Sequence, residues 1–309
     1  MKTLPIKLKE HLLNGTIIPA HPLALTKDRT LDEMRQRRLT RYYMAAGAGG
    51  IAVAVHSTQF EIRDPKIGLF EKVLEVAIEE VEKENLNRNF IMVAGICGPV
   101  EQAVSEAKTA AKLGYDIGLL SMGGLATWSE KDILNRVRKV AEHIPVFGFY
   151  LQPSVGGRIF SYNFWREFVE ISGVEAIKCA SFNRYQTLDV MRAVANSPRR
   201  EQVAMYTGND DKIVADLLTD YLFTVEGEPI KVAFRGGLLG HWAVWTNKVT
   251  KLFEEIKNAK QTGDGAAVRA LLSKGVQITD VNAALFDPAH DFKGCIPGIH
   301  EVLRRQNLL

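Results

Sequence analysis

The stretch GVEAIKCASFN, residues 173–183, is a short apolar segment that carries a lysine, Lys178, near its end. A run of this length and composition predicts a β-strand buried on both faces, as in a parallel sheet. Lysine is almost never fully buried unless it is paired or its charge is removed. Lys178 therefore requires a special environment that the rest of the chain must supply.

Apolar runs of the same kind recur along the chain and alternate with segments of helical periodicity. Pro99 and Gly114 bound one such helical segment, Gly47 ends another, and Ser129 is placed to cap a third. Eight alternating units predict a (β/α)8 barrel with a parallel sheet, and an open doubly wound sheet is disfavoured because no G-x-G-x-x-G opens the first helix. The predicted strands cover residues 15–20, 49–57, 90–98, 115–123, 144–152, 174–180, 202–208 and 230–237.

No linker divides the chain, so we expect one barrel domain, residues 1–258, followed by a helical C-terminal appendage, residues 259–309, packed on the barrel. The segment 211–222, which follows the seventh predicted strand, is expected to be helical.

Composition excludes several classes of function. The chain has 309 residues, of which 46% are hydrophobic and 24% charged, with a net charge of +3, which argues against disorder and nucleic-acid binding. No long apolar run or signal segment occurs, so we expect neither membrane insertion nor secretion and a cytoplasmic location. Cys97, Cys179 and Cys295 have no paired spacing, and we expect them to be small core residues.

Polar residues at the ends of the predicted strands form a candidate active site, because barrel enzymes carry their chemistry at the C-terminal ends of strands. Lys178 and Tyr150 end the sixth and fifth strands, and we expect both side chains to point into the barrel. A desolvated lysine amine is a nucleophile that forms Schiff bases with carbonyl substrates, and a tyrosine can relay protons. Ser57 and Thr58 follow the second strand, where their hydroxyls can hold a carboxylate.

These residues resemble those of the dihydrodipicolinate synthase and N-acetylneuraminate lyase superfamily, the pyruvate-dependent class I aldolases. The segment YLQP, with Tyr150 and Pro153, is similar to the family's Y..P segment, and AIK, with Lys178, is similar to its GIK strand. HSTQF keeps Ser57 and Thr58 of the GTTGE loop but replaces both glycines and the acid.

The segment TGNDD is similar to the family's G.DD segment, which implies that Gly208 lines the site and that Asp210 or Asp211 meets substrate hydroxyls or amines. The family resemblance also implies a Schiff-base lyase that acts on pyruvate or a related 2-keto acid, and an aldehyde, by aldol cleavage, condensation or dehydration. It implies a lysine nucleophile, a tyrosine proton shuttle, no metal or organic cofactor, and a homotetramer.

Two differences between this sequence and the family's motifs argue against a true dihydrodipicolinate synthase. Val155 stands where the family's arginine for the second carboxylate falls, although Arg158 is near enough in sequence to replace it. The strand-four tyrosine loop is replaced by SMGGLATWSE. The identity of the second substrate, the direction of the reaction and a subunit's contribution to its neighbour's relay stay open.

Other interpretations compete with this one. His21, His56 and His241 fall near the ends of strands one, two and eight, and three imidazoles can hold a catalytic metal in a lyase or hydrolase. A barrel that only binds a metabolite or a protein is a third hypothesis, because fold does not determine function. Lys178 itself could also be a structural residue paired with Glu175 or Asp211.

Overall fold

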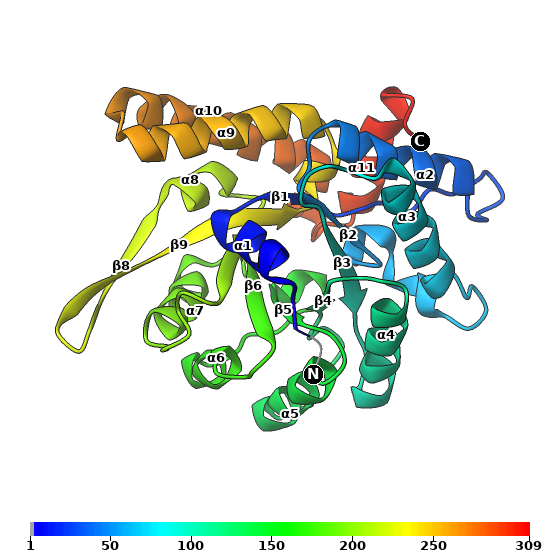
Figure 1. The fold of residues 1–309 in the computed structure, drawn as a ribbon. Coiled ribbons are helices and arrows are strands. Elements are labelled where there is room, and N and C mark those ends of the chain that lie inside the picture. Colours follow the sequence, from blue (N-terminus) through cyan, green and yellow to red (C-terminus); the bar gives the residue numbers. More distant parts are fainter. Residues whose placement is uncertain (1–2) are drawn as a thin grey trace.

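The computed structural model describes residues 3–309, and its centre is a barrel of eight parallel strands (Figure 1). The strands are hydrogen-bonded in the order β1-β9-β7-β6-β5-β4-β3-β2, and every pairing along this path is parallel. A parallel bridge between Ala20 and Ala52 brings the two ends of the sheet together. The predicted (β/α)8 barrel is therefore confirmed.

Strands and helices alternate regularly in the first two thirds of the chain, because each continuous apolar run is followed by an amphipathic segment that covers it. Ser129 accepts the Asp132 backbone N–H as the predicted N-cap of α5. The bounds are β1 Ile17–Pro19, α2 Glu33–Ala45, β2 Gly50–Val53, α3 Phe70–Glu84, β3 Ile91–Ile96, α4 Val100–Lys112, β4 Ile117–Leu120, α5 Glu130–Ala141, β5 Val146–Leu151, α6 Tyr162–Val169, β6 Val174–Ala180, α7 Arg184–Ala195, β7 Ala204–Thr207 and α8 Ile213–Leu218.

Two apolar layers hold the barrel together. One fills the space inside the strands, where Phe147, Ala176 and Tyr206 belong to a single buried cluster, and the other lies between the strands and the surrounding helices. A further helix, α1 (Ile6–Asn14), closes the N-terminal end of the barrel: Leu12 joins the inner cluster, and its carbonyl accepts the Tyr206 hydroxyl at 3.0 Å. α1 thereby covers the N-terminal ends of the strands.

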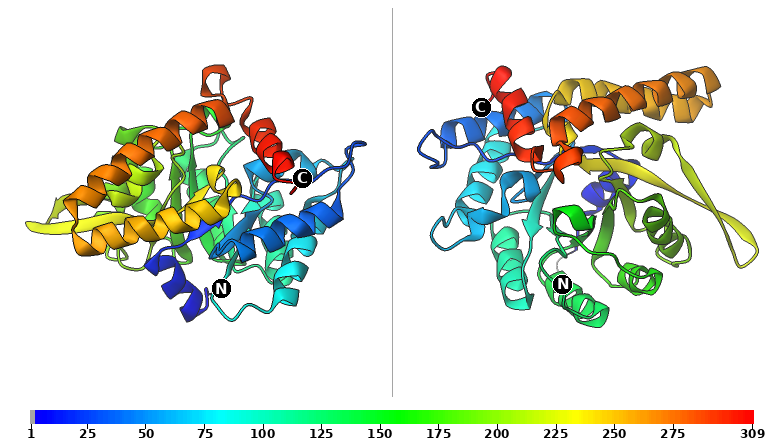
Figure 2. Two further views of the ribbon diagram at one scale, coloured as in Figure 1. Left: turned by 90° about the horizontal axis from the view of Figure 1, so that it is seen from above. Right: turned by 180° about the vertical axis from the view of Figure 1, so that it is seen from behind.

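The eighth unit differs from the prediction. Residues 211–222 do not form one helix, because α8 ends at Leu218 and β8 (Asp220–Val225) follows directly. β8 pairs antiparallel with the outer half of β9 (Glu228–Leu239), and the turn uses positive φ angles at Glu226 and Gly227, as two-residue hairpins require. Figures 1 and 2 show this hairpin projecting from the barrel.

The C-terminal helices are α9 (Thr246–Thr262), α10 (Gly265–Phe286) and α11 (Cys295–Arg305). α9 and α10 run side by side, and α11 returns toward α2, where Arg38 donates to the Asn307 carbonyl at 2.8 Å (Figure 2). The division of the chain at residue 258 stays a prediction, and α9 crosses it. Across residues 3–309, none of the helices combines the length and the apolar character needed to cross a membrane.

Candidate active site

A small cavity of about 80 Å³ lies at the C-terminal end of the barrel strands, opposite α1. Its walls come from the ends of β1, β2, β5, β6, β7 and β9, and its roof comes from the C-terminal segment. Most of the lining is apolar. The polar side chains that line it are His56, Ser57, Gln152, Lys178, Asp210 and Cys295.

Lys178 lies in β6, next to Phe149 of β5 and Tyr206 of β7, and its side chain enters the cavity. The residue is only 8% exposed, and its ammonium lies 4.3 Å from the centroid of the Phe149 ring. Burial lowers the pKa of Lys178, while the negative charge of Asp210 acts in the opposite direction. Lys178 is therefore deprotonated more easily than an exposed lysine.

Lys178 makes no ion pair within 4.0 Å with any of residues 3–309. Glu175, one of the carboxylates that could have explained a structural lysine, pairs instead with Lys9 of α1 at 2.9 Å. The structure therefore gives no support to Lys178 as half of a structural salt bridge.

Tyr150 does not enter the cavity, so the expectation that its side chain points into the barrel is wrong. In the pairing of β5 with β6, Phe149 is the partner of Lys178 and Tyr150 is the partner of Cys179. The Tyr150 ring lies on the outer face, 5.0 Å from Trp165 of α6 between ring centroids. Its hydroxyl accepts the Phe160 N–H at 3.5 Å, and burial raises the pKa of Tyr150 to about 12.

The physical reason for this error is that β5 is apolar on both faces. Phe147, Phe149 and Leu151 face the interior, whereas Val146 and Tyr150 pack against the helices. A strand buried on both sides carries no polar alternation, so its sequence does not indicate which alternate set points inward.

The two hydroxyl residues after β2 have different environments. Ser57 lines the cavity, and its hydroxyl makes only a long contact of 3.4 Å to the His21 carbonyl. Thr58 is fully buried outside the lining: its hydroxyl donates to the same carbonyl at 2.6 Å and accepts the Val55 N–H at 3.2 Å. Ser57 is therefore available to a ligand, whereas the hydroxyl of Thr58 is occupied by the fold.

Gly208 and Asp210 follow β7 and both line the cavity, next to Lys178. A Cβ atom at Gly208 would lie 2.4 Å from Cε of Lys178, so only glycine leaves room for the lysine side chain. One carboxylate oxygen of Asp210 accepts the His241 N–H at 3.2 Å. Burial raises the pKa of Asp210, and the charge of Lys178 opposes that increase.

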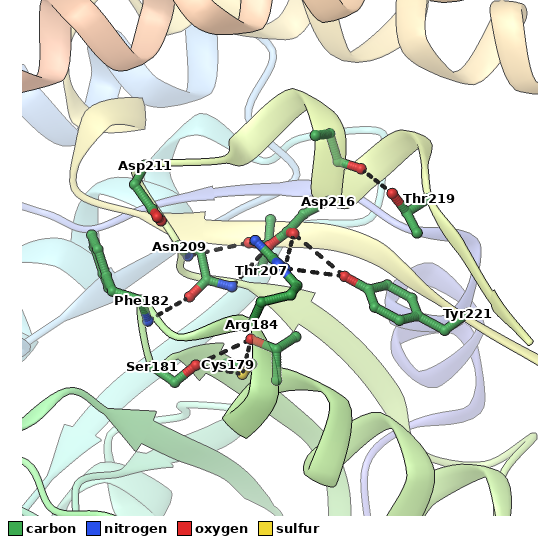
Figure 3. Close-up of polar contacts among 12 residues, drawn as sticks. Cys179, Ser181, Phe182, Arg184, Thr207, Asn209, Asp211, Asp216, Thr219 and Tyr221 are labelled. Atoms are coloured by element: carbon green, nitrogen blue, oxygen red, sulfur yellow. Dashed lines mark hydrogen bonds and ion pairs between the residues drawn. The ribbon is translucent and has the colours of Figure 1, made fainter. Parts of the chain in front are cut away.

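A buried network fixes the loops that carry these residues. The Asp216 carboxylate accepts from Thr207 at 2.7 Å, from Asn209 at 2.8 Å and from Arg184 (Figure 3). The Asn209 side chain in turn accepts the Phe182 N–H at 3.0 Å. The ends of β6 and β7 are thereby joined, which keeps Lys178 and Asp210 on a rigid support.

The three histidines proposed as metal ligands do not come together. His21 is buried beside α2, where one ring nitrogen donates to the Pro22 carbonyl and the other meets the Thr40 hydroxyl at 3.0 Å. His241 donates to the Asn282 side chain at 2.6 Å, and only His56 lines the cavity. Within the described range, 3–309, no group of three or more His, Cys, Asp or Glu side chains is arranged to hold a metal.

The roof of the cavity was not predicted from the sequence; it is formed by Phe286, Phe292, Cys295 and Ile299. The rings of Phe292 and Phe182 meet edge to face with centroids 5.5 Å apart. Cys295 is therefore a lining residue rather than a core residue, and burial raises its pKa to about 12. Contacts between segments this far apart in the chain leave no local sequence signal.

Arg158 does not replace the missing arginine in the cavity. Its guanidinium donates to the carbonyls of Leu125 and Trp128, at 3.2 and 2.7 Å, and holds the loop after β4. Val155 lines the cavity instead. Among residues 3–309, Lys178 is the only lysine or arginine that lines it.

Comparison with solved structures finds the same fold in both branches of the predicted superfamily. Dihydrodipicolinate synthase from Bacteroides thetaiotaomicron superposes with a TM-score of 0.75 at 17% identity, over 99% of this chain and 91% of that one. The enzyme from Oceanobacillus iheyensis gives 0.74 at 18% identity, over 97% and 89%. N-acetylneuraminate lyase from Fusobacterium nucleatum, complexed with pyruvate, gives 0.71 at 16% identity, over 97% and 90%.

The sequence matches no family model and no curated protein. The predicted resemblance to the superfamily is thus confirmed as a likeness of fold. At these identities it does not extend to substrate or reaction.

Proposed function

We propose that this protein is a Schiff-base-forming lyase of the class I aldolase type, acting on pyruvate or a related 2-keto acid. The observation that carries the proposal is Lys178, a buried amine without an ion pair among residues 3–309, in a cavity at the catalytic end of a barrel. A structural lysine would be exposed or paired, whereas a Schiff-base lysine must be desolvated and reachable by a carbonyl.

The chemistry follows from this environment. The neutral Lys178 amine attacks the ketone carbon, and loss of water forms a protonated imine. Ser57, whose hydroxyl faces the cavity, holds the carboxylate of the keto acid. The imine withdraws electrons from the neighbouring carbon, so an enamine forms there and adds to an aldehyde, or departs from one in the reverse direction. Neither a metal nor an organic cofactor is required for these steps.

The residues that line the cavity also limit which second substrate can bind. A second carboxylate needs a cation, but Lys178 is the only lysine or arginine lining the cavity within residues 3–309. Phe149, Phe182 and Phe292 line the cavity instead, and the Phe149 ring centroid lies 4.3 Å from the amine. We infer a small aldehyde without a carboxylate as partner, which distinguishes the reaction from dihydrodipicolinate synthesis. A homotetramer and a cytoplasmic location stay predictions, and light scattering tests the former.

The test is intact-mass measurement after incubation with pyruvate and borohydride, followed by peptide mapping. We expect one reduced adduct on the peptide that contains Lys178 and none in Lys178→Ala. Lys212→Ala, which removes an exposed lysine from the same rim of the barrel, is the matched control and should keep the adduct. If folded protein gave no adduct with pyruvate or with a panel of other 2-keto acids, the lyase would be rejected in favour of a barrel that only binds its ligand.

A further inference from the structure

Schiff-base chemistry needs a group that moves protons as well as an amine. Water leaves the carbinolamine only when its hydroxyl is protonated, and the enamine forms only when a proton is removed from the adjacent carbon. Tyr150, the residue expected to do this work, points to α6 and does not line the cavity. Another side chain in the cavity must therefore perform these transfers.

Four titratable side chains line the cavity within residues 3–309: His56, Lys178, Asp210 and Cys295. Lys178 is the nucleophile itself. Cys295 is a poor base at neutral pH, because burial raises its pKa to about 12. His56 is a weaker candidate than a carboxyl as a proton donor, because burial and the charge of Lys178 both lower its pKa.

Asp210 is placed by three elements of the structure. It lies two residues after Gly208, which packs against the Lys178 side chain, and the carboxyl lines the same cavity as the amine. Its side chain accepts the His241 N–H, and its backbone carbonyl accepts from Asn282 of α10 at 2.7 Å. These bonds hold the carboxyl in place, and its raised pKa leaves it able to exist both with and without its proton near neutral pH.

We propose that Asp210, rather than a tyrosine, is the general acid and base of this site. The inference rests on the proposed lyase function. Its geometric basis is that the Asp210 carboxyl lines the same cavity as Lys178, whereas Tyr150 lies on the outer face of β5.

The proton transfers balance as follows. Lys178 adds to the ketone to give a neutral carbinolamine, and protonated Asp210 donates to its hydroxyl, which leaves as water while the protonated C=N bond forms. The Asp210 carboxylate then removes a proton from the adjacent methyl carbon, and the C–H electron pair becomes the C=C bond of a neutral enamine. After the enamine adds to the aldehyde, the protonated carboxyl neutralises the new alkoxide. Hydrolysis of the imine releases the product and restores both groups.

The experiment separates imine formation from proton transfer. Protein is incubated with pyruvate in D2O. Borohydride trapping after a long incubation measures imine formation. Proton NMR of the pyruvate methyl group measures the exchange of its protons for deuterium. The variants are Asp210→Asn, Asp210→Glu and the control Asp211→Asn. The Asp211 side chain does not line the cavity.

We expect Asp210→Asn to keep the trapped adduct on Lys178 but to lose methyl exchange by about 100-fold or more, the usual contribution of a general base. Asp210→Glu should recover part of the exchange, and Asp211→Asn should behave like the wild type. Removal of a buried charge should leave Asp210→Asn folded. If that variant did not fold, Asp210→Glu would decide, because its carboxyl is displaced from the position of the native one. Exchange that is slower than in the wild type, or absent, would support the proposal, whereas exchange at the wild-type rate would overturn it.

Exchange by folded Asp210→Asn within about threefold of the wild-type rate would overturn the role of Asp210 and leave the lyase intact, since a lost general base costs far more. Absence of both adduct and exchange in the wild-type protein would overturn the lyase itself, and the role of Asp210 with it. The two failures are distinguished by the trapped adduct.

Discussion

Replacement of Gly208 by alanine tests the placement of Lys178 directly. The new Cβ atom would lie 2.4 Å from Cε of Lys178 and 2.9 Å from Cβ of Ala180, where ordinary contacts begin at 3.4 Å. The lysine stem must therefore move by about 1 Å, and a misplacement of this size costs on the order of 100-fold in rate when it affects a reacting group. Ala180 has no flexible side chain, so the backbone of β6 or β7 must also yield.

The measurement is the rate of the borohydride-trapped adduct with pyruvate, compared with the free energy of unfolding of the same variant. We expect a rate loss of about 100-fold, together with a stability loss of about 1–3 kcal/mol, which is typical of overpacking. Gly240→Ala is the matched control, because its Cβ would meet Ile299 and Phe286 at 3.6 Å, an ordinary contact. That variant borders the same cavity but does not touch Lys178, so its rate should fall by less than about threefold.

A Gly208→Ala protein that formed the adduct as fast as the wild type would refute the reasoning, because Lys178 could not then lie against Gly208. A variant that lost its overall fold would show this in the unfolding measurement before the rate was interpreted.

Tyr150, His21 and the choice of aldehyde give three further predictions. Tyr150→Phe should keep methyl exchange within about twofold of wild type and lose less than about 1 kcal/mol of stability, because its hydroxyl makes one long hydrogen bond outside the cavity; a 100-fold loss of exchange would return the proton shuttle to Tyr150. His21 should make the fold acid-sensitive: burial lowers its pKa to about 4, below the 6.5 of an unfolded histidine. The unfolded chain therefore binds the extra proton, and stability present above pH 6.5 should be lost toward pH 4, by about 3 kcal/mol. Denaturation at several pH values should show a steeper decline for the wild type than for His21→Gln, and equal slopes would contradict the assignment. Finally, small apolar aldehydes should be turned over with pyruvate in preference to aldehydes that carry a second carboxylate, as product analysis by mass spectrometry would show; a preference for the acidic aldehydes would contradict the inferred substrate class.

Some features of the site were predictable from local sequence. Lys178 in an apolar run and Ser57 after the second strand line the cavity, because strand ends in a parallel barrel meet at one rim. Gly208 and Asp210, which the family resemblance implied, line it as well. The same reasoning does not extend to Thr58. Thr58 directly follows Ser57, but its hydroxyl donates to the His21 carbonyl.

The sequence by itself determined the barrel, because eight apolar runs separated by amphipathic segments have few other ways to bury their surfaces. Tertiary structure alone decided that Phe149 rather than Tyr150 faces Lys178, since a strand buried on both faces has no polar alternation to mark its inner side. It also decided that Cys295 and Phe292 roof the cavity beside Asp210. Such contacts join residues that lie far apart in the sequence, and only packing in three dimensions brings them together.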